Sequence, residues 1–156
     1  MPLRFRLAVP ADYPRLEEMV IESFASITWF RKVDELFGPL NGRDWRSRWQ
    51  LRLKSAFTRQ TVLIGEEGPG IVAYASGSYD PPTRSAYIDL LAVDPRCQGK
   101  GYGRDMLRAI VEHFRQQGAE HAHLDCLLNN QAGNQLYESE GFQKVAEHAR
   151  WWLKIP

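Results

Sequence analysis

Apolar and polar residues follow two different periods along this chain. Strict alternation over short stretches predicts strands, because successive side chains of a strand point to opposite faces. It is clearest where Leu3, Phe5 and Leu7 alternate with arginines. The pattern predicts strands over residues 3–8, 61–65, 71–79, 86–93 and 121–127. Residues 142–155 are also strand-like, with a turn expected near 147–149.

The remaining segments place apolar residues three and four positions apart, which is the spacing of one helix face. Asp12 is expected to cap the first helix, whose apolar face includes Leu16 and Val20. The predicted helices run from Asp12 to about residue 24, over 33–37, over 43–57, from a glycine-rich loop to Gly118, and from Asn129 or Asn130 to about Ser139.

The predicted order is β-α-α-β-β-β-α-β-α-β-β, which indicates a mixed α/β (α+β) fold. The 156 residues contain no repeat, linker or low-complexity segment. We therefore expect a single domain over residues 1–156.

Composition and charge narrow the class of function. The net charge of +1 gives no overall attraction to nucleic acid or to an anionic membrane. No apolar run approaches the roughly 20 residues that cross a bilayer, and the N-terminus lacks an apolar signal segment. Cys97 and Cys126 fall in different predicted elements. These features favour a reduced, cytoplasmic protein.

Two local clusters suggest other functions. Residues 43–59 hold six basic side chains and one acid, but the near-neutral chain favours a solvated face over a nucleic-acid site. His121 and His123 share one strand face. Two histidines without a third ligand are weak evidence for a metal site, so none is expected.

The stretch from Leu90 to Arg104 carries the strongest chemical signal. A strand ends at Asp94-Pro95 and is followed by Gln98-Gly99-Lys100-Gly101-Tyr102-Gly103, which opens a helix. The first turn of a helix leaves about four N–H groups without partners, and the helix dipole adds partial positive charge there. Glycines let a diphosphate approach those groups closely.

The spacing of these glycines excludes two common phosphate sites. A Walker loop needs Ser or Thr after Gly-Lys, where this chain has Gly101, and an early glycine where it has Asp94. The dinucleotide fingerprint G-x-G-x-x-G also fails, which argues against a nucleotide-binding oxidoreductase or kinase. The pattern that does fit is Gln/Arg-x-x-Gly-x-Gly/Ala, at Gln98, Gly101 and Gly103.

A second motif follows downstream, from Asn130 through Leu136-Tyr137-Glu138 to Gly141-Phe142. With both motifs in this order, the chain resembles the GNAT superfamily of acyl-CoA-dependent N-acyltransferases over most of its length. The resemblance implies a central mixed, mostly antiparallel sheet with a splayed parallel strand pair and flanking helices. It also implies transfer of an acetyl group from acetyl-CoA to a primary amine.

The resemblance further implies where the cofactor lies. In the family, CoA enters the V-shaped opening between two parallel strands, here residues 86–93 and 121–127. The first of these strands binds the pantetheine amides, and the glycine-rich loop binds the pyrophosphate. The implied cofactor contacts are Leu91, Ala92, Val93, Gln98, Gly99, Lys100, Gly101, Tyr102, Gly103, Asn130 and Asn134.

Direct attack by an amine involves two proton transfers. Freeing the lone pair of a lysine-like ammonium near pH 7 costs roughly 4–5 kcal/mol, so a general base helps. The leaving thiolate benefits from an acid. The resemblance implies Tyr137, on one helix face with Asn130 and Asn134, as that acid. The base stays open between Asp89, Asp125 and an ordered water.

The sequence is compatible with several alternatives. The same fold could serve as a non-catalytic acyl-CoA sensor, although retention of Tyr137 argues against it. The acceptor could be a small amine, an amino acid or a peptide N-terminus. A homodimer is compatible with the resemblance, because many relatives pair through their C-terminal strands.

Overall fold

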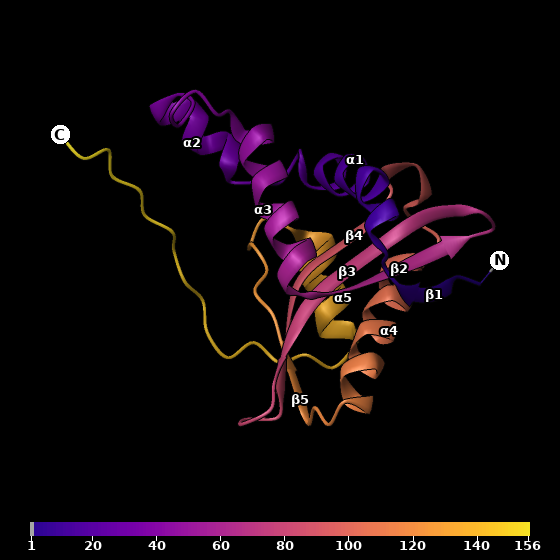
Figure 1. Ribbon diagram of the computed structural model, residues 1–156. Coiled ribbons are helices and arrows are strands. Elements are labelled where there is room, and N and C mark those ends of the chain that lie inside the picture. The colour runs from indigo at the N-terminus through magenta and orange to yellow at the C-terminus, as the bar shows by residue number, and fades with distance from the viewer. Residues whose placement is uncertain (1) are drawn as a thin grey trace.

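The computed structural model describes residues 2–156 and has a five-stranded sheet with helices on both faces (Figure 1). The strands lie in the order β1 (Arg4–Leu7), β2 (Thr61–Glu67), β3 (Gly70–Asp80), β4 (Ser85–Val93) and β5 (His121–His123). Neighbours from β1 to β4 are antiparallel, whereas β4 and β5 are parallel. The predicted mixed sheet with one parallel pair is therefore confirmed.

Helices form a layer on each face of this sheet. One face is covered by α1 (Tyr13–Phe24) and α3 (Trp45–Arg59), whose apolar residues share a core cluster with Ile64 and Tyr74. The other face is covered by α4 (Tyr102–Gln116). The remaining elements are α2 (Phe30–Phe37), α5 (Gln131–Ser139) and the short 3-10 helices η1 (Pro10–Asp12) and η2 (Pro95–Cys97).

Strand β4 contains a bulge that changes which face its side chains occupy. Ser76 of β3 pairs with Leu90, and the next residue, Gly77, pairs with Ile88, so Asp89 is an extra residue in β4. Upstream of it, Ile88 packs into the α4 core, whereas Leu90 packs into the α1–α3 core. A Cβ on Gly77 would lie 2.3 Å from the carbonyl oxygen of Tyr87, so only glycine fits opposite this bulge.

The parallel partner of β4 is shorter than the predicted strand over residues 121–127. Pairing ends at Tyr87 with His123, and the chain diverges from β4 beyond that point. Burial still alternates through Cys126, which explains the prediction, but no neighbouring strand bonds these residues within the described chain.

The two strands predicted over residues 142–155 are wrong, because this segment forms neither helix nor strand. Figure 1 shows it as an extended trace beside the domain. Val145 and Trp151 are 96% and 89% exposed, and the ring of Trp152 contacts Trp29 with centroids 6.0 Å apart. Alternation indicates which side chains could share a face, whereas a strand also needs a neighbour to bond.

Candidate active site

The glycine-rich loop leads into α4 without a capping side chain. Gly101 is the N-cap residue and adopts a left-handed conformation, with φ of +83°, and Gly99 has the same φ. No atom lies within 4 Å of the Cβ position at either glycine. The first-turn N–H groups of α4 are therefore open to an anion, as the helix dipole favours.

Three segments predicted to contact one cofactor meet at this loop. The Cβ position of Gly103 lies 3.8 Å from Val93 at the end of β4 and 3.7 Å from Leu136 on α5. Beyond Tyr87, the edge of β4 that faces β5 has no strand partner among residues 2–156. The main chain at Leu91, Ala92 and Val93 lies along this open edge, where a ligand amide could bond as a strand would.

Side chains of the loop are engaged mainly with neighbouring elements. Gln98 donates to the carbonyl oxygen of Val93 at 3.5 Å, and the Lys100 ammonium lies 3.7 Å from the Glu67 carboxylate. The buried Tyr102 donates its hydroxyl to Glu67, and that bond raises the pKa of Tyr102 to about 12. Only the main chain of Tyr102 can therefore meet a ligand at the loop.

Both predicted asparagines are held at the start of α5. Asn130 caps this helix by accepting from the Gly133 N–H at 3.1 Å. The amide of Asn134 donates to the carbonyl oxygens of Leu127 and Asn130 at 2.9 and 2.8 Å. These bonds leave the amide donors of Asn130 and the side-chain carbonyl of Asn134 with bonding capacity.

Tyr137 lies one turn further along α5, half-buried against the ring of Phe142, with centroids 5.8 Å apart. Burial, with a smaller effect of the Cys126 thiol, raises the pKa of Tyr137 to about 12. Its hydroxyl has no hydrogen-bond partner between residues 2 and 156. The phenol therefore stays protonated near neutral pH and has a proton to donate.

The two predicted base candidates have different surroundings. Asp89, in the bulge of β4, accepts two hydrogen bonds from Arg52 of α3, at 2.9 and 3.2 Å, and its side chain is 10% exposed. Asp125 accepts from the Tyr87 hydroxyl at 3.2 Å, and its side chain is 64% exposed. Burial, then the charges of Asp125 and Asp89, raise the pKa of Tyr87 to about 12.

Sequence reasoning missed Arg52, which it assigned to a solvated face of the arginine-rich helix. Helical spacing carried a signal, because Arg52 lies three residues after the buried Trp49 and four before the buried Ala56. Its guanidinium also stacks on the Trp49 ring, 5.3 Å from the centroid. Arg52 therefore belongs to the side of α3 that faces the sheet.

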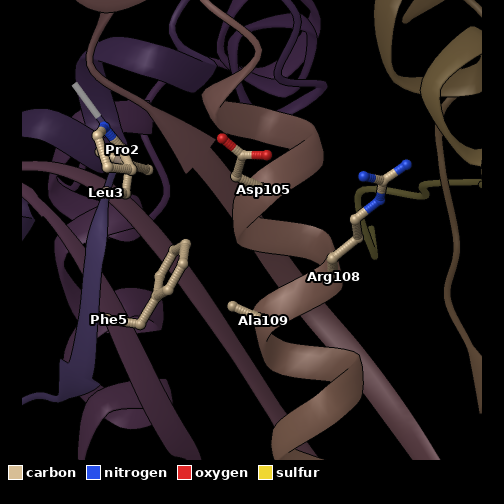
Figure 2. A pocket seen from close by; sticks show the side chains of 6 residues that line it. All are labelled: Pro2, Leu3, Phe5, Asp105, Arg108 and Ala109. Carbon is tan, nitrogen blue, oxygen red and sulfur yellow. The ribbon is translucent and has the colours of Figure 1, made fainter.

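A hollow of about 410 Å³ lies between β1 and the outer side of α4, away from these residues (Figure 2). Its lining includes none of the side chains predicted to bind the cofactor or to transfer protons. The lining residues are Pro2, Leu3, Phe5, Asp105, Arg108 and Ala109.

Residues 2–156 contain neither a membrane-spanning helix nor a cluster of metal-binding side chains. None of the helices there is both long and apolar enough to cross a membrane. In the same part of the chain, no three His, Cys, Asp or Glu side chains gather closely enough to hold a metal ion.

Two curated relatives share sequence with this chain. The N-alpha-acetyltransferase RimI of Mycobacterium tuberculosis is 35% identical over 106 residues, which cover 63% of this chain and 65% of that protein. The mycothiol acetyltransferase of Beutenbergia cavernae is 30% identical over 91 residues, or 58% of this chain and 31% of the relative. The matches thus span about a third to two thirds of these relatives.

Solved structures share the fold. The PaiA N-acetyltransferase of Thermoplasma acidophilum, solved in complex with coenzyme A, has a TM-score of 0.71 at 16% identity, covering 92% of this chain and 91% of that one. The ribosomal-protein-S18-alanine N-acetyltransferase of Escherichia coli has a TM-score of 0.69 at 18% identity, covering 92% and 79%. Residues 26–142 match the family model described as Acetyltransferase (GNAT) family. The chain therefore belongs to the GNAT acetyltransferase family.

Proposed function

We propose that this chain is an N-acetyltransferase that moves the acetyl group of acetyl-CoA to a primary amine by direct attack, within one domain over residues 1–156. The observation that carries the proposal is the meeting of the uncapped start of α4, the open edge of β4 and the Tyr137 helix at Gly103. The coenzyme A complex of PaiA, which has the same fold, supports the choice of cofactor.

The main chain supplies most of the cofactor contacts. The N–H groups from Gly99 to Gly103 would donate to the pyrophosphate, as the helix dipole favours. Leu91–Val93 pair with β3 on one side, and their main-chain groups that point away from β3 would bond the pantetheine amides. The side chain of Asn130 can still donate a hydrogen bond and that of Asn134 can still accept one. Together they could bind the carbonyl oxygen and the N–H of a ligand amide.

Tyr137 is the proposed general acid. Acetyl-CoA supplies the acetyl group as a thioester when bound. The Tyr137 hydroxyl would give its proton to the departing sulfur, and its raised pKa of about 12 keeps that proton in place until it is needed. Such assistance is typically about 10²–10⁴-fold in rate.

Asp89 is the proposed general base, directly or through a water. The bulge places it on the face covered by α3, and two hydrogen bonds from Arg52 hold it in one orientation. Asp125 is the competing candidate, but its more exposed carboxylate is less firmly positioned. Asp89→Asn should lower kcat more than Asp125→Asn, and the reverse order would reassign the base.

The test of the whole proposal is thiol release from acetyl-CoA with a panel of amines. Peptide N-termini belong in the panel because RimI is an N-alpha-acetyltransferase, and small amines belong because a streptothricin acetyltransferase is 29% identical over 89 residues. We expect turnover with at least one amine. Coenzyme A binding without turnover on any of them would favour a non-catalytic acyl-CoA sensor.

A further inference from the structure

Two hydroxyl groups in the centre of the sheet have no hydrogen-bond partner. They belong to Tyr74 and Ser76 of β3, both fully buried, and within residues 2–156 no group bonds the oxygen of either side chain. A buried hydroxyl without a partner loses its bonds to water and gains nothing in return. Two of them side by side therefore point to a small polar ligand.

Both hydroxyls lie next to the proposed base. Tyr74 and Ser76 are two residues apart on β3, so they share the face covered by α1 and α3. Ser76 pairs with Leu90, the neighbour of Asp89 in the bulge. Burial has the largest effect on the pKa of the Tyr74 phenol and raises it to about 12, and the nearby Ser76 hydroxyl lowers it. Asp89 and Arg52 follow, the first raising and the second lowering this pKa, so the phenol also lies within the influence of the charged pair.

Asp89 has bonding capacity to share with such a ligand. An ionised carboxylate offers about four acceptor positions, and Arg52 uses two of them. The ligand must therefore donate to a carboxylate and accept from two hydroxyls. Water has that capacity and is small enough for a fully buried position.

We propose that Tyr74 and Ser76 hold one buried water molecule that donates a hydrogen bond to the carboxylate of Asp89. Tyr74 and Ser76 both donate to the water, which leaves its own protons for Asp89. The base would then be oriented from α3 by Arg52 and from β3 by this water. Tyr74 and Ser76 are positioning residues in this arrangement, and only their kinetic effect rests on the proposed function.

Thermal unfolding of Tyr74→Phe, Ser76→Ala and the double variant tests the water site without turnover. If the two hydroxyls share one water, each single variant lowers Tm, and the double variant lowers it by less than the sum of the two. If the hydroxyls are unpaired, removing them relieves a desolvation penalty and Tm rises. A rise in Tm, or strictly additive losses, would overturn the proposal.

Two substitutions of Ser76 separate the effect of side-chain shape from the effect of the hydroxyl. Ser76→Thr and Ser76→Val have nearly the same volume, and only the first keeps a hydroxyl. We expect Ser76→Thr to retain a several-fold higher kcat than Ser76→Val, with the KM for acetyl-CoA the same in both. Equal kcat values would show that the Ser76 hydroxyl does not position Asp89. The Tm values of Tyr74→Phe, Ser76→Ala and the double variant would still test the water site.

Control variants come from the same strand. Tyr79→Phe and Ser78→Ala remove the same two hydroxyl types from β3, but Tyr79 packs on the α4 side and Ser78 is exposed. Both should leave Tm and kcat nearly unchanged. A crystal structure should show a water within hydrogen-bond distance of Tyr74, Ser76 and Asp89, and an empty space there would contradict the proposal.

Discussion

Tyr137 keeps its proton further into the alkaline range than an exposed tyrosine does, because its ring is half-buried on Phe142. The raised pKa means that the folded protein favours the neutral phenol up to about pH 12. An acid of this kind is available at every pH at which the amine acceptor is reactive. Asp89 differs, since it is oriented by a charged partner from another element of the fold.

Replacing Tyr137 with Phe removes the proposed acid and keeps the ring contact with Phe142. We expect kcat to fall by about 10²–10⁴-fold, with little change in the affinity for coenzyme A. The phenol stays protonated between pH 7 and 10, so ionisation of Tyr137 should not lower the wild-type rate in this range. The pH profiles of the wild type and Tyr137→Phe should therefore have the same shape there. Unchanged turnover in Tyr137→Phe would remove the assignment of the acid.

Replacing Arg52 with Ala leaves the Asp89 carboxylate without its partner. The pair is only partly buried, with side chains 36% and 10% exposed. Its loss should cost roughly 1–2 kcal/mol of unfolding free energy, a value between those for exposed and for buried ion pairs. Arg59→Ala, at the end of the same helix, is the control and should cost little. Equal Cm values in urea for the two variants would contradict this role of Arg52.

Elements differ in how well their local pattern could be predicted. The helices follow apolar spacing and caps: Asp44, for example, accepts from the Ser47 N–H at 2.8 Å and starts α3. The bulge at Asp89 and the early end of β5 depend on neighbouring strands, so residue order alone could not show them. The Arg52–Asp89 bond joins residues 37 apart in the sequence, so it could be recognised only in the packed fold. The glycine loop could be recognised from the sequence, because its motif is a spacing between nearby residues.

The start of α4 is the element whose geometry can be tested most directly. Gly101→Ala places a Cβ in a left-handed conformation, which costs about 1–2 kcal/mol, and sets it beside the first-turn N–H groups. Gly42→Ala imposes similar strain, at φ of +74° and with no atom within 4 Å, between α2 and α3. We expect only Gly101→Ala to weaken coenzyme A binding, by about tenfold or more in Kd measured by calorimetry.

At the scale of the whole molecule, coenzyme A should stabilise the folded chain because its contacts come from three separate segments. At a concentration of 100 Kd the gain is about 2.7 kcal/mol, which corresponds to a Tm rise of roughly 5–10 °C for a chain of this size. NAD and ATP should give no comparable rise, since neither of their glycine fingerprints is present. A larger shift with either nucleotide would contradict the assignment of the loop.

The extra residue in β4 has a consequence for how the two helical layers depend on each other. Strand β4 contributes Ala86 and Ile88 to the core on the α4 side, and Leu90 and Ala92 to the core on the α1–α3 side. Neither layer can therefore detach without exposing part of the same strand. Deleting Asp89 would place Leu90 directly after Ile88, and regular alternation would keep each side chain on the face that it occupies now. The deletion should therefore remove the Asp89 carboxylate and the bulge while sparing both cores.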